Sequence, residues 1–178
     1  MTMDPVPAAI VTVSLAALWL TAAVHKLADA KAFADSLAAY RLLPQRLTPF
    51  LGRVLPIAEI ALAVGLLFGR TQAIAGALGG LLLVAYGAAI AVNLGRGRRE
   101  LDCGCLAFGR GARLSGALVW RNALLAIASF VIALAPRTAR QWGWIDAWTT
   151  LGGFAVAALL YVAAEELRAV AQRLPRGG

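Results

Sequence analysis

The chain has 178 residues, of which 61% are hydrophobic and only 15% are charged. A soluble domain of this length is nearer half apolar and about a quarter charged, so the composition excludes an ordinary soluble domain. The formal net charge of +8 does not indicate nucleic-acid binding. Most of the basic residues flank apolar segments, where they contact anionic lipid head groups. We therefore expect a protein of the lipid bilayer that binds no nucleic acid.

Apolar segments long enough to cross a bilayer recur along the whole chain. A span needs about 20 mostly apolar residues, because a helix rises about 1.5 Å per residue and the hydrocarbon core is about 30 Å thick. Barrel strands would alternate, and these segments do not. The sequence therefore predicts an all-α, polytopic membrane helix bundle, with a four-helix core and five transmembrane helices. A single membrane domain covers residues 1–178, with spans at about 7–24, 54–68, 73–94, 117–135 and 148–164.

The first span is expected to stay in the protein. Residues 1–5 contain Asp4 and no Lys or Arg, whereas a signal peptide carries positive charge in that position. His25, Lys26 and Leu27 follow the apolar segment in place of a small-residue cleavage site. We interpret this segment as a retained helix.

The segment after the first span predicts a short amphipathic helix lying in the membrane interface. Its apolar residues fall at helical spacing with charged residues between them, and Pro44 ends it. The apolar positions are Ala30, Phe33, Leu37 and Tyr40, and the charged ones are Asp29, Lys31, Asp35 and Arg41.

Two further patterns bear on how the spans pack. Gly69–Gln72 is a short connection, so the second and third spans are expected to form an antiparallel hairpin. Small residues in the spans allow helix backbones to approach closely, and we assign them no catalytic role. These glycines are Gly76, Gly79, Gly80, Gly87, Gly152 and Gly153.

Trp142, Trp144 and Trp148 indicate an interfacial aromatic cluster at the start of the fifth span.

The loop of residues 95–116 holds both cysteines of the chain, Cys103 and Cys105. A disulfide between them would close a small, strained ring across Gly104, and strained disulfides tend to be labile or catalytic. Arginines in the same loop favour the thiolate, which is the attacking form. The pattern therefore favours a catalytic thiol pair over a structural one. A metal site needs about four ligands, and the chain offers two thiolates and one distant His, unless a second chain contributes.

Polar residues of four spans are expected to converge on the side of the bundle that bears the cysteine loop. Glu59 lies inside an apolar span, and such groups usually face the bundle interior and are paired, with Lys26 or His25 as the expected partner. One interpretation is that this pair only ties two helices together. The other is a proton relay and polar pocket beside the cysteines. The residues are His25, Lys26, Glu59, Asn93, Arg121 and Asn122.

Several of these motifs, in this order, resemble MauE, the methylamine utilisation membrane protein family related to DoxX-like proteins. The resemblance runs from about residue 18 to residue 130. It departs in one place, because Leu106-Ala107 separates the second cysteine from Phe108-Gly109. The matching pieces are His25-Lys26-Leu27, Phe33, Tyr40, Leu42-Leu43-Pro44, Pro56, Glu59, Asp102-Cys103-Gly104-Cys105 and Arg121-Asn122.

The resemblance implies an inner-membrane protein needed for processing or maturation of the methylamine dehydrogenase small (β) subunit. It implies a thioredoxin-like, MauD-type partner and disulfide formation in that periplasmic client. The protein would then be a membrane thiol–disulfide oxidoreductase or a subunit of one. The sequence identifies no certain cofactor and leaves a membrane quinone open. The alternatives are a non-catalytic assembly or docking factor and a small transporter subunit in which Glu59 is the coupling group.

The charge distribution and the resemblance disagree about compartment. With five spans, fourteen Lys and Arg residues share the side of the cysteine loop, and only Arg70, Arg137 and Arg140 fall on the other side. The positive-inside rule then places the cysteine loop in the cytoplasm. A periplasmic client requires the opposite, because disulfides form in the periplasm. For the working site we follow the resemblance and expect the periplasmic face.

Overall fold

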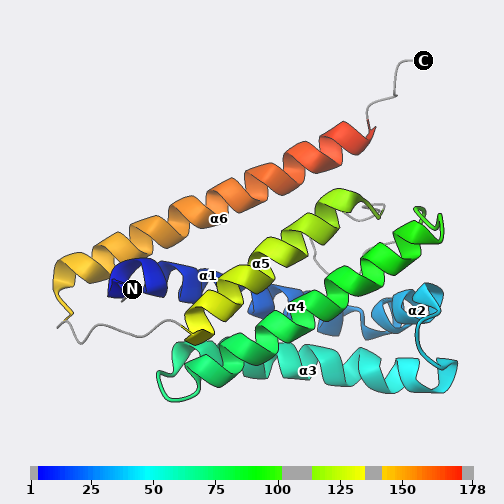
Figure 1. Cartoon of the computed structure of the whole chain (residues 1–178), viewed down its shortest axis with the longest axis horizontal. Coiled ribbons are helices and arrows are strands. Elements are labelled where there is room, and N and C mark those ends of the chain that lie inside the picture. The colour runs from blue at the N-terminus through cyan, green and yellow to red at the C-terminus, as the bar shows by residue number, and fades with distance from the viewer. Residues whose placement is uncertain (1–3, 102–113, 135–141, 174–178) are drawn as a thin grey trace.

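A computed structural model describes residues 4–101, 114–134 and 142–173 of the chain. Within these residues the chain is entirely helical, with no strand, which confirms the predicted fold class (Figure 1). The elements are α1 (Pro5–Ala28), α2 (Ala30–Tyr40), the 3-10 helix η1 (Gln45–Leu47), α3 (Thr48–Leu67), α4 (Gln72–Gly95), α5 (Gly116–Leu134) and α6 (Trp144–Arg173).

Five stretches of helix are long and apolar enough to cross a membrane, as predicted. They cover Pro5–Ala28, Gln45–Leu67, Gln72–Gly95, Gly116–Leu134 and Trp144–Leu167. The second span begins earlier than the sequence suggested. Pro49 lies in the first turn of α3, where its missing N–H costs no hydrogen bond, and the helix continues through Pro56. The prolines therefore do not delay the start of this span.

Four of the long helices form the core, and α6 lies at its edge (Figure 1). The central apolar cluster includes Leu15 and Trp19 of α1, Leu66 of α3, Leu83 of α4 and Ala126 of α5. Helix α6 packs chiefly on α1. The predicted four-helix core is thus confirmed, with the fifth span outside it.

Glycines set the close approach of α4 to α5. A Cβ atom at Gly76 would lie 3.0 Å from the carbonyl oxygen of Ser129, and one at Gly80 would lie 2.7 Å from the Phe130 ring. The Ser129 hydroxyl donates a hydrogen bond of 2.8 Å to the Gly76 carbonyl. The packing role predicted for these glycines is confirmed, whereas Gly152 of α6 has no neighbour within 4 Å of such a Cβ.

The connection between α3 and α4 is short, as expected for a hairpin. The Thr71 hydroxyl donates hydrogen bonds of 2.8 Å to the Gly65 carbonyl and 3.2 Å to the Phe68 carbonyl. These bonds close the end of α3. The two spans therefore run antiparallel beside one another (Figure 1).

Helix α2 is the predicted amphipathic helix, and its apolar side packs on the bundle. Asp29 caps its first turn by accepting a hydrogen bond of 3.0 Å from the Ala32 amide. Phe33 and Tyr40 are buried, and Ala34 lies against Gly52 of α3. The apolar face of α2 therefore belongs to the protein core at that end of the bundle.

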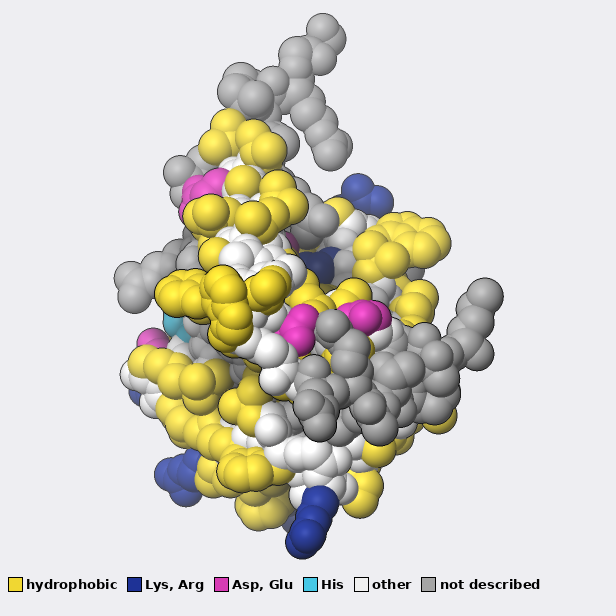
Figure 2. All heavy atoms as spheres, turned by 90° about the vertical axis from the view of Figure 1, so that its left-hand side faces the viewer, with side chains coloured by type: hydrophobic (Ala, Val, Ile, Leu, Met, Phe, Trp, Pro, Cys, Tyr) yellow, Lys and Arg dark blue, Asp and Glu magenta, His cyan; other side chains and the backbone are white. Residues whose placement is uncertain are grey.

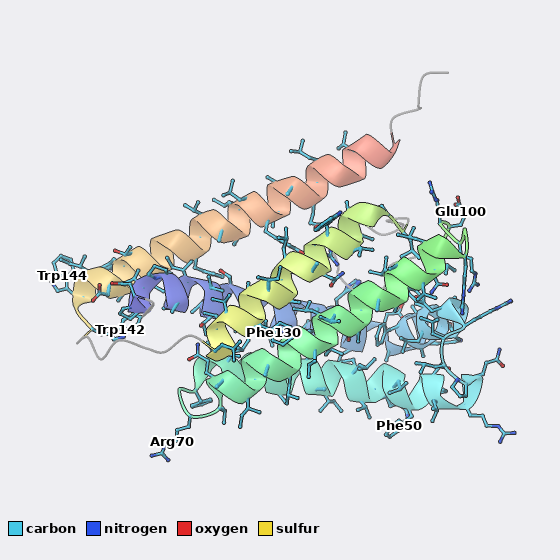
Figure 3. All side chains as sticks on the ribbon, in the orientation of Figure 1. Phe50, Arg70, Glu100, Phe130, Trp142 and Trp144 are labelled. Atoms are coloured by element: carbon cyan, nitrogen blue, oxygen red, sulfur yellow. The ribbon has the colours of Figure 1, made fainter. Side chains whose placement is uncertain are left out.

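The outer surface of the bundle is apolar, as the bilayer requires. Figure 2 shows hydrophobic side chains over much of the end that bears Trp144. Trp142, Trp144 and Trp148 are 56%, 75% and 68% exposed at the start of α6. Figure 3 places Trp142 and Trp144 at one end of the molecule and Glu100 at the other. The exposed tryptophans fit the predicted aromatic cluster at a membrane interface.

Candidate functional site

The most deeply buried charges of the described residues form an ion pair between α1 and α3. Lys26 and Glu59 are 2% and 0% exposed, and the Lys26 ammonium donates a hydrogen bond to Glu59 Oε1. The Tyr86 hydroxyl of α4 donates to the same oxygen at 2.7 Å. Three helices thus contribute to one hydrogen-bonded cluster, which we call the Lys26–Glu59–Tyr86 cluster.

Aromatic rings surround the ammonium group of this cluster. Lys26 Nζ lies 5.0 Å from the centre of the Phe33 ring and 4.8 Å from that of Tyr86. The face of an aromatic ring attracts a cation, most strongly where water is excluded. The ring of Trp19 lies 6.5 Å from that of Tyr86 and closes the cluster toward the middle of the bundle. The charge of Lys26 is therefore stabilised by a carboxylate and by two rings.

A small cavity joins this cluster to α5. Its lining includes Lys26, Glu59 and Tyr86 together with Arg121 and Asn122, and its volume is about 10 Å³. A cavity of this size holds about one water molecule. The cavity itself leaves no room for a transported substrate.

A second buried ion pair fixes Arg121. Its Nη1 atom lies 3.5 Å from Oε1 of Glu165 in α6, and the two side chains are 7% and 10% exposed. Asn122 donates a hydrogen bond of 2.8 Å to the Leu118 carbonyl within its own helix. Arg121 therefore faces both the small cavity and α6.

The base of the cysteine loop is closed at the end of the bundle nearest this cluster. The Leu114 amide donates a hydrogen bond of 3.1 Å to the Arg99 carbonyl, joining the two ends of the loop. Arg98 donates hydrogen bonds to Asn93 Oδ1 at 3.3 Å and to the Tyr40 carbonyl at 3.4 Å. Cys103 and Cys105 themselves lie outside the described residues.

The structure brings together four of the six polar residues expected to converge, whereas Asn93 is buried and donates a hydrogen bond to the Ala89 carbonyl within its own helix. Lys26, Glu59, Arg121 and Asn122 line the same small cavity. His25 is half-buried and does not line it. Of the two partners proposed for Glu59, Lys26 is the one it contacts, because the helical rotation from residue 25 to residue 26 turns the side chain into the bundle.

Tyr86, Glu165 and Trp19 were missed by the sequence analysis. Tyr86 is a lone hydroxyl within an otherwise apolar span, which was a usable signal because buried hydroxyls seek partners. Glu165 follows the predicted end of the fifth span and therefore looked like a solvated residue. Helix α6 continues as far as Arg173, so Glu165 remains inside the span.

The polar groups of the cluster form one hydrogen-bonded set. Lys26 Nζ, Tyr86 Oη and Glu59 Oε1 are mutually within hydrogen-bond distance, with 3.4 Å between Nζ and Oη. Glu59 Oε2 is buried and has no hydrogen-bond partner among the described residues. Buried polar atoms usually have a partner, so this oxygen is an open acceptor inside the bundle.

Five membrane-crossing helices around buried ion pairs define a polytopic helical membrane protein. A family model described as methylamine utilisation protein MauE matches residues 4–135. The chain belongs to this family, and its relatives place it in methylamine utilisation.

Curated MauE proteins match most of the chain. The one from Paracoccus versutus is 41% identical over 162 residues, which cover 90% of this chain and 87% of the relative. The one from Methylorubrum extorquens is 39% identical over 130 residues, covering 73% and 70%. The one from Paracoccus denitrificans is 34% identical over 153 residues, covering 86% and 82%. No solved structure matches the chain.

Proposed function

We propose that this protein acts in the inner membrane to support disulfide formation in the small subunit of methylamine dehydrogenase. Membership of the MauE family is the observation that carries the pathway. The Cys103–Gly104–Cys105 motif supports the chemistry, and it belongs to the loop that follows α4 at the end of the bundle nearest the Lys26–Glu59–Tyr86 cluster. Its partner is a thioredoxin-like, MauD-type protein.

The proposed reaction is thiol–disulfide exchange. A thiolate of the client attacks the Cys103–Cys105 disulfide and forms a mixed disulfide. A second client thiolate then attacks this mixed bond, which leaves a disulfide in the client and two thiols at Cys103 and Cys105. The disulfide form of the thioredoxin-like partner reoxidises these thiols by the same exchange. Two electrons and two protons pass overall from the two thiols of the client to the two thiols of the reduced partner, so no net proton is released.

The buried cluster supports this chemistry by accepting and returning protons. Each exchange step uses a thiol that must lose a proton or produces a thiolate that must gain one. A nearby proton acceptor lets these protons move without exchange with bulk water. Glu59 Oε2 is such an acceptor, and the cavity beside it has room for about one water molecule. Glu59 thus serves as the proton acceptor, and Lys26 and Tyr86 position its carboxylate by donating hydrogen bonds to Oε1.

A second candidate function is a non-catalytic assembly or docking factor. The Lys26–Glu59 ion pair and the Tyr86 hydroxyl join three helices, and this bonding alone stabilises the bundle. In that case the cysteines would only hold the shape of the loop. The two candidates differ in whether the cysteines change redox state during maturation.

The test replaces each cysteine in cells that grow on methylamine. Cys103→Ser and Cys105→Ser are each expected to abolish disulfide formation in the small subunit, because each removes one sulfur of the pair. Ser115→Ala, at the end of the same loop, is the control and is expected to behave as wild type. Small-subunit disulfides are counted by alkylation and mass spectrometry. Wild-type maturation in both cysteine variants would disprove the redox role.

The face of the membrane on which the cysteines work is tested by thiol labelling of intact cells. Two of the fourteen basic residues, Lys26 and Arg121, are buried in ion pairs, so they do not contact lipid head groups. Twelve remain, which still favours the cytoplasm over the periplasm. The proposed client nevertheless requires labelling of Cys103 and Cys105 from outside after reduction, with a cytoplasmic cysteine protein as the silent control. Labelling only after lysis would contradict direct exchange with a periplasmic client.

A further inference from the structure

A large apolar pocket separates α6 from the core. Its volume is about 440 Å³, and it lies between α1, α5 and α6. Most ligand pockets measure about 300–1,000 Å³ and are lined by apolar side chains with a few polar groups. This pocket has that character, because Val11, Leu125 and Ala157 line it together with the hydroxyl residues Ser14 and Tyr161. All of these residues belong to membrane-crossing helices.

The large pocket adjoins the small polar cavity of the candidate site. Leu18 and Leu125 line both spaces, so these two side chains form the partition between them. On one side of the partition lie apolar walls, and on the other lie Glu59, Arg121 and Asn122. An occupant of the pocket therefore lies among hydrocarbon side chains and the hydroxyl groups of the pocket wall, such as that of Ser14, with the buried charges behind the partition.

The charges near the partition favour a neutral polar end. The two positive side chains, Lys26 and Arg121, each face a carboxylate, so the charges balance in number. An anionic or cationic head group would add an unpaired charge inside the membrane, which is costly. The pocket would therefore recognise the neutral polar end of its occupant by hydrogen bonds. Ser14 Oγ lines the large pocket, is buried and has no hydrogen-bond partner among the described residues.

The depth of the pocket favours a lipid without an interfacial head group. Leu18 lies near the middle of α1 and Leu125 near the middle of α5, so the partition lies far from both membrane surfaces. A phospholipid keeps its head group, and with it its ester groups, at the interface. An isoprenoid quinone carries its carbonyl groups on a compact ring and has no charged head, so it can reach this depth.

We propose that the pocket between α1, α5 and α6 binds a neutral lipid of the quinone class, with a ring carbonyl accepting a hydrogen bond from Ser14. The assignment rests on the pocket and its neighbouring charges and not on the cysteine chemistry. Helix α6 forms one wall of the pocket. It is held to the rest of the bundle at Gly153, which lies against Ile10, and at Glu165, which pairs with Arg121.

The test measures equilibrium binding of tritiated decylubiquinone to the full chain in phosphatidylcholine nanodiscs. Ala157→Phe fills the pocket and is expected to weaken binding at least tenfold. Ala155→Phe adds the same volume to an exposed position of α6 that does not line the pocket, and it is expected to bind as wild type. Ser14→Ala removes the proposed donor and is expected to weaken binding about threefold to tenfold, the range for one neutral hydrogen bond.

Saturable binding at one site with this order of variants supports the proposal. Non-saturable partitioning into the nanodisc would overturn it, as would equal losses in the two phenylalanine variants. Displacement of the quinone by an equal concentration of dioleoylglycerol would assign the pocket to ester lipids and overturn the quinone class. Thermal unfolding checks that each variant is folded. If Ala157→Phe does not fold, Ala128→Leu on the α5 wall and Ser14→Ala are used to test the site.

Discussion

The two buried ion pairs lie in differently packed parts of the molecule. Lys26 and Glu59 belong to helices of the four-helix core, where the Tyr86 hydroxyl and the rings of Phe33 and Tyr86 complete the surroundings of the charges. Arg121 and Glu165 join that core to α6 across 3.5 Å, beside a pocket of about 440 Å³. The first pair joins two helices of the core, whereas the second joins the core to the outermost helix, although Arg121 lines the same small cavity as Lys26 and Glu59.

This contrast shows how the chain uses charge within a membrane. Lipid is as apolar as a protein core, so apolar contacts alone do not distinguish helix–helix contact from helix–lipid contact. Glycines of α4 give the core its close packing. The Lys26–Glu59 ion pair then fixes the position of α1 relative to α3 along their axes. Helix α6 lacks such a glycine surface toward α5 among its described residues. Its position depends on Gly153 and on one ion pair.

The largest effect is expected when one partner of the core pair is removed. Glu59→Leu leaves the Lys26 ammonium buried without its carboxylate, which should cost about 3–5 kcal/mol of unfolding free energy. Lys26→Met should cost a similar amount. The double variant should recover most of this loss, because no charge then remains unpaired. Thermal unfolding in detergent measures all three. A double variant no more stable than the single ones would show that the pair itself holds the core.

A smaller loss is expected from overpacking between α4 and α5. Gly76→Leu places a side chain against the backbone of α5, where a Cβ atom already lies 3.0 Å from the Ser129 carbonyl oxygen. Overpacking of this kind costs about 1–3 kcal/mol. Gly152→Leu on α6 is the matched control, and it should change stability by less than about 0.5 kcal/mol. Equal losses in the two variants would refute the glycine-packed core.

The smallest effect on stability is expected at the edge of the bundle. Glu165→Gln removes the charge that Arg121 faces but keeps a hydrogen-bonding oxygen across the 3.5 Å contact, and we expect it to lower the unfolding free energy by about 1 kcal/mol. Hydrogen exchange of α6 should become faster while that of α3 and α4 stays unchanged. Glu166→Gln, one residue further and exposed, is the control. Faster exchange throughout the core would contradict a loosely attached α6.

The sequence allowed the helical class, the five spans and much of the buried cluster to be predicted. Length and apolarity determine the spans, and an ionisable residue inside a span must find a partner, which identified Glu59 and left Lys26 and His25 as the two candidates for its partner. The partner of Arg121 was not predictable, because the depth of Glu165 depends on how far α6 continues. The pocket beside α6 was not predictable either. The pocket depends on the distance between α6 and α5, and the small residues in the sequence of α6 do not determine that distance.

We infer that the Lys26–Glu59–Tyr86 cluster takes part in the chemistry of Cys103 and Cys105 and does not only hold helices together. Glu59→Gln tests this most directly, because the amide keeps the size of the side chain and an oxygen that accepts from Tyr86 and Lys26, but it no longer takes up a proton. We expect the variant to keep its fold but to reach a lower level in the membrane, because Lys26 loses its counter-charge, so maturation is measured per amount of protein. We also expect small-subunit disulfide formation to be slower by about tenfold or more, within the range of lost general acid–base catalysis. Glu166→Gln should mature the small subunit as wild type does. Unchanged maturation in Glu59→Gln, or a loss that only follows the amount of protein in the membrane, would contradict the claim.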